Sequence, residues 1–428
     1  MYLLRLLRSR LNLRYLFFSQ RREVTKNVVS ETKYELYRLE SGPAEKTTMN
    51  EEEATYALKT MIYIRRMENK AAELYRLRLI NGFLHLYSGQ VEFTISRINR
   101  TSRHHESDDN RKKKKKKKWR RGRKRGKKRT ISKKENYVFA QEAVAVGTKM
   151  SITEKDSLIT AYRCHGFAVV FGTSAREIFA ELMGRKTGIS KGKGGSMHMY
   201  GKQFFGGDGI VGGQIPVGAG LGFAQKYKGT GGVAWAFYGD GAASQGQIYE
   251  AFNMSKLWNL PVVYICENNQ YAMGTVVHRH SANTNFYTRG DLIPGVKVDG
   301  MRVMDVREAV KFARDYALRN GPILLEMVTY RYFGHSMSDP GTSYRTRDEV
   351  KKMQSEQDPI ESLTKLLVDN GVKTEAEILE IRKNTQKAVD EELEQAKVDP
   401  YPEMSDIAKD VYVKPLEKTR GKAPWETH

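Results

Sequence analysis

Short apolar runs alternate with amphipathic stretches through the middle of the chain. The apolar runs cover residues 157–162, 233–238, 260–266, 295–298 and 322–329, and each has the length of a strand buried on both faces. Between the second and third runs, residues 245–258 repeat apolar side chains at helical spacing. Strands that alternate with helices in this way predict an α/β fold, a parallel sheet with helices on both faces.

Longer helical patterns flank this region. Residues 50–78 carry apolar side chains on one helical face, and residues 375–397 form the longest of several charged helical stretches. We therefore predict an α/β domain over residues 45–357 and a helical C-terminal appendage over residues 358–428. A glycine-dense stretch, residues 184–222, suits either backbone that wraps a ligand or a mobile surface loop.

Polar residues stand at the ends of two neighbouring predicted strands. Asp240 follows the run 233–238 within Gly239-Asp-Gly241, and Asn269 follows the run 260–266. A right-handed strand–helix–strand unit brings both strand ends to one sheet edge, where ligands of open α/β sheets bind. Carboxylate and amide oxygens suit Mg²⁺, which often takes phosphate oxygens as further ligands. The pattern predicts a site for a magnesium-bound diphosphate; two ordinary strand-terminal turns are the alternative.

Most of the net charge of +23 lies in one segment. Residues 91–141 hold 21 Lys/Arg and five Asp/Glu, and they show no hydrophobic periodicity. Such a segment is disordered in isolation. Basic runs also serve nuclear localisation or nucleic-acid binding, so a nucleic-acid-binding protein that acts through residues 111–129 is an alternative function. Because the charge is confined to this segment, we expect no nucleic-acid partner.

We favour a third interpretation of residues 91–141, namely a retained intron. The segment has 51 residues, begins with valine, whose codons start with GT, and ends with glutamine, one of whose codons is CAG. These are the bases found at the two ends of an intron. Removing the segment joins Ser88-Gly-Gln90 to Glu142, which creates a Ser-x-x-Glu capping box for the following helix. The predicted domain is then interrupted by a disordered basic insert.

The first thirty residues have the pattern of a mitochondrial transit peptide. Arginines are spaced among leucines, and the first acidic residue is Glu23. The alternative is an N-terminal amphipathic helix of the mature protein. No apolar stretch reaches the length of a membrane span, and the two cysteines, Cys164 and Cys266, give no disulfide framework or metal-binding spacing. We therefore predict a mitochondrial matrix protein with no membrane association.

Motifs along most of the chain match a known family. They are Gly82-Phe-Leu-His-Leu-Tyr87, Ile159-Thr-Ala-Tyr-Arg-Cys-His-Gly166, Lys191-Gly-Lys-Gly-Gly-Ser-Met-His198, Gly207-Asp-Gly-Ile-Val211, Tyr238-Gly-Asp-Gly-Ala242, Cys266-Glu-Asn-Asn269 and Tyr330-Arg-Tyr-Phe-Gly-His-Ser-Met-Ser-Asp-Pro-Gly341. With them the chain resembles the α subunits of mitochondrial pyruvate dehydrogenases, which are thiamine-diphosphate-dependent 2-oxo acid dehydrogenases. The resemblance covers residues 51–412 apart from the insert. It implies the diphosphate-binding domain of the thiamine-diphosphate-binding fold.

The resemblance also implies residue roles. It places Asp240, Asn269 and the Tyr271 carbonyl on Mg²⁺, and it makes His85 and His335 the catalytic histidines, with His85 on the pyruvate carboxylate. Without the motifs, each histidine would be interpreted as an ordinary buried one. The expected contacts to thiamine diphosphate are made by Tyr162, Arg163, Gly209, Val211, Gly241, Ala242 and His335, of which Tyr162 and Arg163 also face the substrate.

The implied reaction is decarboxylation of pyruvate on the cofactor and transfer of the acetyl group to a lipoyl arm of the next component. Cofactor activation needs a carboxylate on a second domain, and the chain is long enough for only one large domain. The resemblance therefore implies a β subunit that supplies an activating glutamate in an α₂β₂ enzyme. A lipoyl-bearing acetyltransferase is the expected further partner.

Regulation follows from the same resemblance. Ser336 and Ser343 stand where family members are phosphorylated, which implies a regulatory kinase and phosphatase. A third family phosphosite falls on Val276, which cannot be phosphorylated. The chain also departs from the family pattern at Asp208, Ser244 and Ala272. Within the same chemistry, the alternative is an α subunit that acts on branched-chain 2-oxo acids, which the 333–341 loop disfavours.

Overall fold

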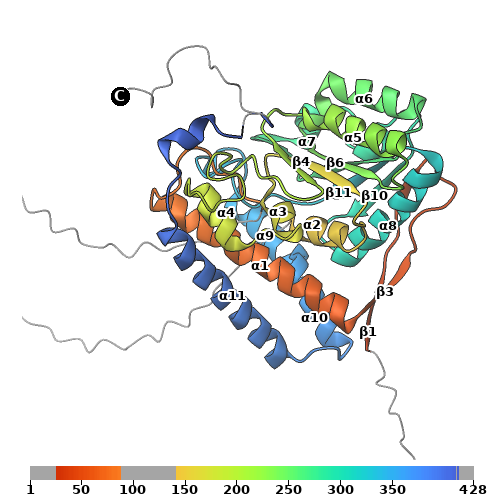
Figure 1. The fold of residues 1–428 in the computed structure, drawn as a ribbon. Coiled ribbons are helices and arrows are strands. Elements are labelled where there is room, and N and C mark those ends of the chain that lie inside the picture. The colour runs from red at the N-terminus through yellow and green to blue at the C-terminus, as the bar shows by residue number, and fades with distance from the viewer. Residues whose placement is uncertain (1–25, 88–140, 411, 414–428) are drawn as a thin grey trace, which may run out of the picture.

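The computed structural model describes residues 26–87, 141–410 and 412–413. Its centre is a seven-stranded sheet in the order β2-β10-β11-β7-β6-β4-β5 (Figure 1). The edge strand β2 is antiparallel to β10, and all other neighbours in this sheet are parallel. The strands are β2 (Glu35–Tyr37), β4 (Ser157–Ala161), β5 (Phe204–Asp208), β6 (Ala234–Gly239), β7 (Val262–Asn268), β10 (Gly295–Asp299) and β11 (Ile323–Val328).

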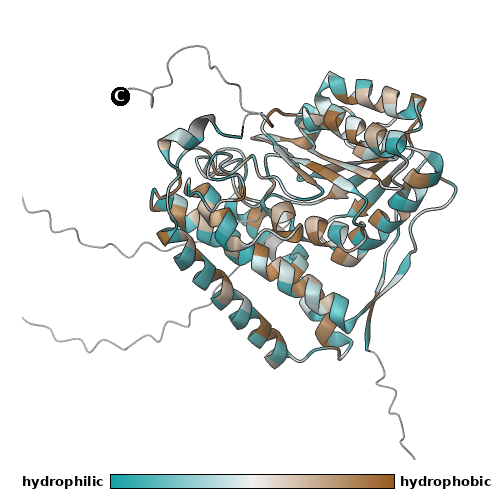
Figure 2. Ribbon diagram, viewed as in Figure 1, coloured by the Kyte–Doolittle hydropathy of each residue, from teal (hydrophilic) through white to brown (hydrophobic). Residues whose placement is uncertain are grey.

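Helices cover both faces of the sheet. α5 (Gln214–Lys228) and α6 (Gly246–Leu257) lie on one face, whereas α2 (Glu142–Lys149), α8 (Val303–Asn320) and the long α1 (Glu51–Arg76) lie on the other (Figure 1). Successive β6 residues enter different cores: Ala236 packs on the side of α5 and α6, and Phe237 on the side of α1 and α2. The outer helices carry both polar and apolar residues (Figure 2). The predicted α/β fold is confirmed.

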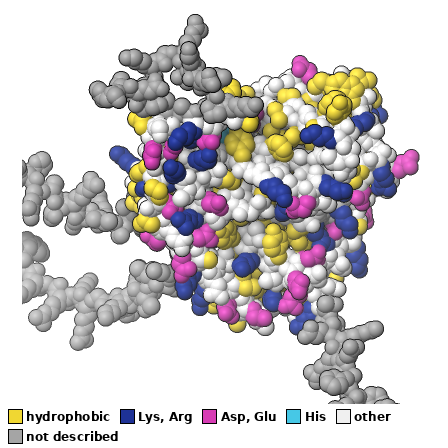
Figure 3. Space-filling view, viewed as in Figure 1, with side chains coloured by type: hydrophobic (Ala, Val, Ile, Leu, Met, Phe, Trp, Pro, Cys, Tyr) yellow, Lys and Arg dark blue, Asp and Glu magenta, His cyan; other side chains and the backbone are white. Residues whose placement is uncertain are grey.

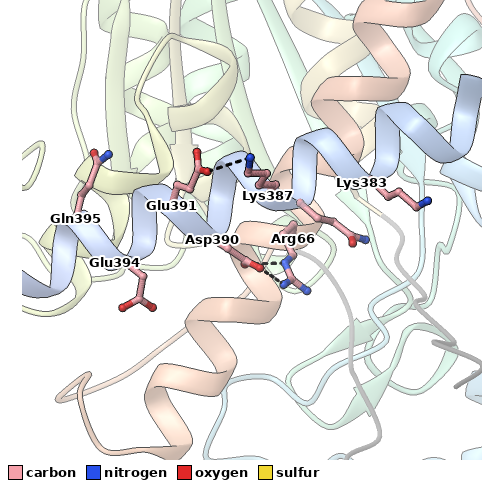
Figure 4. A pocket seen from close by; sticks show the side chains of 8 residues that line it. Arg66, Lys383, Lys387, Asp390, Glu391, Glu394 and Gln395 are labelled. Atoms are coloured by element: carbon pink, nitrogen blue, oxygen red, sulfur yellow. Dashed lines mark hydrogen bonds and ion pairs between the residues drawn. The ribbon is translucent and has the colours of Figure 1, made fainter.

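The C-terminal helices pack on the same core. α9 (Arg347–Gln357) and α10 (Pro359–Asp369) precede α11 (Glu375–Val398), which contacts α1 and α4 (Ala175–Leu182). Leu363 and Leu393 are buried in the cluster that includes α1. Arg66 Nε lies 2.9 Å from Asp390 Oδ1 across the contact between α1 and α11 (Figure 4). An open, charged groove of about 680 Å³ follows this face of α11.

Smaller elements complete the described chain. β1 (Asn27–Glu31) pairs with β3 (Lys46–Asn50), and β8 (Tyr271–Ala272) pairs with β9 (Thr275–Val276). α3 (His165–Val170) follows β4, and α7 (Val277–His280) follows β9. Short 3₁₀ turns occupy Ala242–Ser244, Phe286–Thr288 and Met404–Ala408.

Part of the glycine-dense stretch is ordered around a buried carboxylate. Glu181, in α4, is 1% exposed, and it accepts four backbone N–H groups at 2.7–3.0 Å. A Cβ at Gly194 would lie 1.9 Å from the His198 carbonyl oxygen, so this turn requires glycine. The donors are Ser190, Gly192, Gly194 and Gly195.

Helix α2 begins less favourably than the long helices. α1 and α11 start with capping boxes at Asn50 and Thr374, whereas the N-cap of α2, Gln141, makes no side-chain cap. Glu142 is fully buried; its Oε1 lies 3.5 Å from Arg65 Nε, and its Oε2 has no partner among the described residues. Burial raises the pKa of Glu142 to about 7.

The residues on either side of the undescribed segment 88–140 meet at one carboxylate. The Tyr87 hydroxyl donates to Glu267 Oε1 at 3.0 Å, and Gln141 Nε2 donates to the same oxygen at 3.4 Å. Burial raises the pKa of Glu267 to about 7. The predicted insert lies outside the described residues except for Gln141, and the predicted transit peptide lies outside them except for residues 26–30. No helix in the described ranges combines the length and apolarity needed to cross a bilayer.

Candidate active site at the carboxyl edge of the sheet

The two predicted metal ligands follow adjacent strands. β6 and β7 are parallel neighbours with Gly239 opposite Glu267, so Asp240 and Asn269 emerge together at the carboxyl edge. Asp240 is 2% exposed, and its Oδ2 lies 3.2 Å from His280 Nε2. The Asn269 side-chain oxygen accepts the N–H of Tyr271 at 3.4 Å. The structure therefore places Asp240 and Asn269 at one edge of the sheet, as the strand–helix–strand pattern predicted. Tyr271 lies at the same edge.

Gly241, which follows Asp240, packs closely against Ala272. A Cβ built on it would lie 2.8 Å from the Cβ of Ala272, the residue that departs from the family pattern. Ala242 and Ser244 begin and end the 3₁₀ turn that follows. The turn between Asp240 and α6 is therefore compact, and residues 241–244 in it carry only small side chains.

A second predicted turn borders the first. Gly209 and Val211 follow the end of β5, and the Asp208 carboxylate accepts the N–H of Ile210 at 2.8 Å. A Cβ on Gly212 would lie 3.0 Å from the Gln245 side chain, which places this turn beside the start of α6. Val211 is 44% exposed.

The predicted histidines form a cluster with Tyr162. The ring of His85 lies 4.7 Å from that of Tyr162 and 5.4 Å from that of His335, measured between centroids. Burial, then the Arg163 cation, lower the pKa of His85 to about 3, and the same causes lower the pKa of His335 to about 4. Both rings are therefore neutral near pH 7. His85 Nδ1 is buried without a partner among the described residues.

Arg163 joins this cluster to the neighbouring loops. Its Nη1 donates to the Leu86 carbonyl at 2.8 Å, and its Nη2 donates to the His335 carbonyl. Arg163 is 6% exposed, so it is a buried residue and not a surface one. It clamps the segment of His85 to the loop of His335 and adds a buried positive charge.

Arg331 is a site residue that the sequence patterns did not single out. It is 3% exposed and donates Nη2–H to the Met273 carbonyl, while its Nε and Nη1 have no partner among the described residues. Burial, then Arg163, lower its pKa to about 10, which leaves it charged at neutral pH. Buried guanidinium donors without acceptors suit an anionic ligand.

The loop after β11 is held by two side chains. Asp339 accepts the N–H of His335 at 2.7 Å and the hydroxyl of Tyr344 at 2.6 Å, and Arg345 donates to the carbonyls of Arg331, Tyr332 and Phe333. Ser336 is 8% exposed, whereas Ser343 is exposed. The two predicted phosphosites thus lie in one ordered loop.

The donor set fits a magnesium diphosphate. Asp240, Asn269 and a backbone carbonyl offer hard oxygen ligands, and no cluster of three or more His, Cys, Asp or Glu side chains in the described chain suggests a different metal. The two Arg331 donors that lack partners among the described residues suit the anionic part of such a ligand. Arg331 lies within the Tyr330–Gly341 motif, so the motif signalled it although its burial could not be inferred.

A family model for the dehydrogenase E1 component matches residues 122–405, more than half of the chain. The chain belongs to the dehydrogenase E1 component family. Dehydrogenase E1 components depend on thiamine diphosphate, which agrees with the diphosphate prediction.

Relatives in this family come from several kingdoms. The chain is 46% identical over 374 residues to the mitochondrial pyruvate dehydrogenase E1 component subunit alpha of Saccharomyces cerevisiae, which covers 86% of this chain and 77% of that protein. It is 44% identical to subunit alpha-1 of Arabidopsis thaliana, over 87% of this chain and 83% of that protein. It is 43% identical to the somatic form of the human mitochondrial subunit alpha, over 92% of this chain and 88% of that protein.

Proposed function

We propose that the chain is the α subunit of a mitochondrial pyruvate dehydrogenase, which decarboxylates pyruvate and passes the acetyl group to a lipoyl arm for acetyl-CoA formation. One observation carries the proposal: Asp240 and Asn269 share a sheet edge, and the unpaired donors of Arg331 lie beside the His85–Tyr162–His335 cluster. The names of the relatives support pyruvate over branched-chain 2-oxo acids, and "mitochondrial" in those names supports the matrix location.

We assign the cofactor end of the site to named residues. Asp240, Asn269 and the Tyr271 carbonyl would hold Mg²⁺, and Arg331 with the Gly241–Ala242 backbone would face the phosphates. Tyr162, Arg163 and His335 border the same space, and Gly209 and Val211 border it from the next turn. When bound, thiamine diphosphate supplies the nucleophilic carbon on which pyruvate is decarboxylated.

The substrate end depends on the two histidines. A neutral imidazole carries one N–H donor and one acceptor, so His85 can donate to the pyruvate carboxylate without a permanent charge of its own. Arg163 supplies positive charge behind it while holding the two loop carbonyls. His335 has its pKa lowered to about 4 and is therefore neutral at pH 7, so it would donate or accept a hydrogen bond near the reacting carbon.

We infer that a β subunit completes the site in an α₂β₂ enzyme and supplies the activating glutamate. Large apolar side chains around the sheet edge are exposed: Phe83 by 63%, Ile210 by 73% and Met273 by 64%. A second exposed group on α5 and α6, Phe223, Tyr227, Leu257 and Trp258, lies where Figure 3 shows a gathering of hydrophobic side chains. Such patches mark protein interfaces. The lipoyl-bearing acetyltransferase is the partner expected to take the acetyl group.

We also propose that a kinase and a phosphatase control the enzyme at Ser336 and Ser343. A phosphate adds about −2 charge, and Ser336 is buried next to His335. The group would not fit without displacing the loop held by Asp339. Val276 ends β9 and carries no hydroxyl, so a third control site is absent there.

For residues 91–141 we propose a retained intron, whose removal completes the start of α2. Two observations support this account: Gln141 does not cap α2 with its side chain, and Glu142 Oε2 has no partner among the described residues. The joined sequence Ser88-Gly-Gln90-Glu142 is a capping box, which would supply both the cap and the partner. Sequencing the mature transcripts tests the intron account, which is wrong if every message retains the segment.

The activity test is co-expression with a β subunit, with and without residues 91–141. We expect thiamine-diphosphate-dependent decarboxylation of pyruvate by the shortened form, with branched-chain 2-oxo acids turned over far more slowly. No activity in the shortened form would overturn the proposed function. Salt-dependent binding to RNA or DNA that is lost with residues 91–141 would instead favour a nucleic-acid-binding role.

A further inference from the structure

The segment that carries His85 depends on side chains from elsewhere for its shape. Residues 84–87 belong to no helix or strand. The His85 N–H donates to Ser196 Oγ at 3.1 Å, and the Tyr87 N–H donates to Glu68 Oε2 at 2.6 Å. The Leu84 carbonyl accepts the N–H of Met337 at 3.0 Å. The backbone on both sides of the histidine is therefore held by single hydrogen bonds.

Ser196 and Glu68 are joined to each other through His165. His165 Nδ1 lies 2.5 Å from Glu68 Oε1, and His165 Nε2 lies 2.9 Å from the Ser196 carbonyl oxygen and 3.1 Å from its Oγ. Glu68 and His165 are 0% exposed and Ser196 is 5% exposed. The three side chains, from α1, the start of α3 and the glycine-dense stretch, form one buried unit beneath the His85 segment.

This unit is rigid at each end. Glu68 belongs to the 26-residue helix α1, and the turn that leads to Ser196 is fixed by the four N–H groups bound to Glu181. Both nitrogens of His165 face oxygen atoms, a carboxylate on one side and the Ser196 oxygens on the other. Hydrogen bonds to a carboxylate are shorter and stronger than neutral ones, so the ring transmits its position from α1 to Ser196.

The His85 ring has few anchors of its own. Its Nδ1 is buried without a partner among the described residues, and the ring lies tilted against Tyr162 and edge-on to His335. Its position relative to the substrate therefore follows from its backbone.

We propose that Glu68, His165 and Ser196 are positioning residues for His85, and that they set the affinity for the carboxylate of a small 2-oxo acid. The proposal rests on the proposed role of His85 toward pyruvate. Ser196 acts by accepting the His85 N–H, His165 by fixing the Ser196 hydroxyl, and Glu68 by orienting His165 and holding the next turn of the segment.

The test compares Ser196→Ala with Cys164→Ala in the α₂β₂ enzyme, made with and without residues 91–141. Ser196→Ala removes the hydroxyl that accepts from His85 but keeps the carbonyl that faces His165. Cys164→Ala is the matched control, since Cys164 Sγ lies 3.5 Å from the same carbonyl and does not touch the hydroxyl. The readouts are KM and kcat for pyruvate and the affinity for methyl acetylphosphonate, a pyruvate analogue that cannot be decarboxylated.

We expect Ser196→Ala to raise KM and to weaken analogue binding about tenfold, with kcat within twofold and cofactor affinity unchanged. Cys164→Ala should match the parent enzyme. The proposal is overturned if Ser196→Ala lowers the melting temperature but leaves KM and analogue affinity at the values of the parent enzyme. His165→Gln is the second variant and should shift KM in the same direction.

His85→Ala separates this inference from the function on which it rests. If His85→Ala leaves both KM and analogue affinity unchanged, the role of His85 is wrong and the inference fails with it. If His85→Ala weakens analogue binding while Ser196→Ala and His165→Gln do not, the positioning role alone is wrong.

Discussion

Two of the places where the described chain buries polar atoms without partners differ in their cause. At the sheet edge, Arg331 holds two donors, Nε and Nη1, without partners among the described residues. At the start of α2 the unpartnered atom is an acceptor, Oε2 of Glu142. The first region lies among ligand-binding motifs, whereas the second directly follows the undescribed segment 88–140.

The difference shows that an unsatisfied buried group has to be interpreted with its surroundings. Arg331 would gain partners if an anion bound, which is why we propose that its donors mark a binding site. Glu142 gains a partner when the helix acquires an N-cap residue, so its acceptor marks a disrupted helix start. Adding a ligand should stabilise the first region, and removing residues should stabilise the second.

The largest effect is expected at the sheet edge. Arg331→Met removes the unpaired donors, and we expect the dissociation constant for thiamine diphosphate to rise roughly 50-fold, measured by titration of cofactor-free α₂β₂ enzyme. Arg314→Met is the control, because Arg314 is an arginine of α8 outside the candidate site. Its Nε already pairs with Asp156 Oδ2 at 2.9 Å. Equal cofactor affinity in the two variants would mean that Arg331 does not face the diphosphate.

Deleting residues 91–141 tests the second region. The joined Ser-x-x-Glu box should cap α2 and satisfy Glu142, and we expect the free energy of unfolding to rise by about 2 kcal/mol. Urea denaturation of the two forms measures this change. A shortened chain that is no more stable than the full one would contradict the cap interpretation.

A single substitution sharpens the contrast between the two forms. Glu142→Met should stabilise the full chain by about 1 kcal/mol, because it removes a buried carboxylate whose one contact, to Arg65, is long and whose Oε2 has no partner among the described residues. The same change should destabilise the shortened chain by about 1 kcal/mol, because it removes the capping acceptor. The folded-state pKa of Glu142 is about 7, above the unfolded value, so the gain in the full chain should grow as pH rises from 4.5 to 7. Effects of the same sign in both forms would argue against the box.

The smallest effect concerns the pH dependence of the ligand-free sheet edge. The pKa values of His85 and His335 are lowered to about 3 and 4 in the folded state, so the unfolded chain binds more protons below pH 6.5. Stability should therefore fall as pH drops from 6.5 toward 4, and His85→Gln should make that fall shallower. Denaturation at several pH values measures the slope. An unchanged slope in His85→Gln would show that the ring is not held neutral.

The sequence predicted regular elements better than side-chain partnerships. Runs such as 233–238 and 322–329 are apolar along their whole length, and the structure confirms them as β6 and β11. The strands β1, β2, β3 and β5 were missed because they are short and polar or contain two glycines, as in Phe204–Asp208.

The site divides in the same way. Asp240 and Asn269 could be placed together because strand order fixes both. Arg331, His165 and Glu68 could not, since hydrogen-bond partners 97 residues apart, such as Glu68 and His165, leave no local pattern. Their roles depend on burial, which only the packed structure reveals.

The shared contact of Tyr87 and Gln141 with Glu267 also bears on protein engineering. With the two chain ends tied to one carboxylate, the peptide between them closes a loop, and doubling a loop's length costs only about 0.6 kcal/mol. The length of this connection therefore contributes little to the free energy of unfolding, and the gain expected on deletion of residues 91–141 comes from the start of α2 instead. A fluorescent module grafted there would sit beside Glu267, which lies on β7 two residues before Asn269, where it could report on cofactor binding at the proposed site in real time.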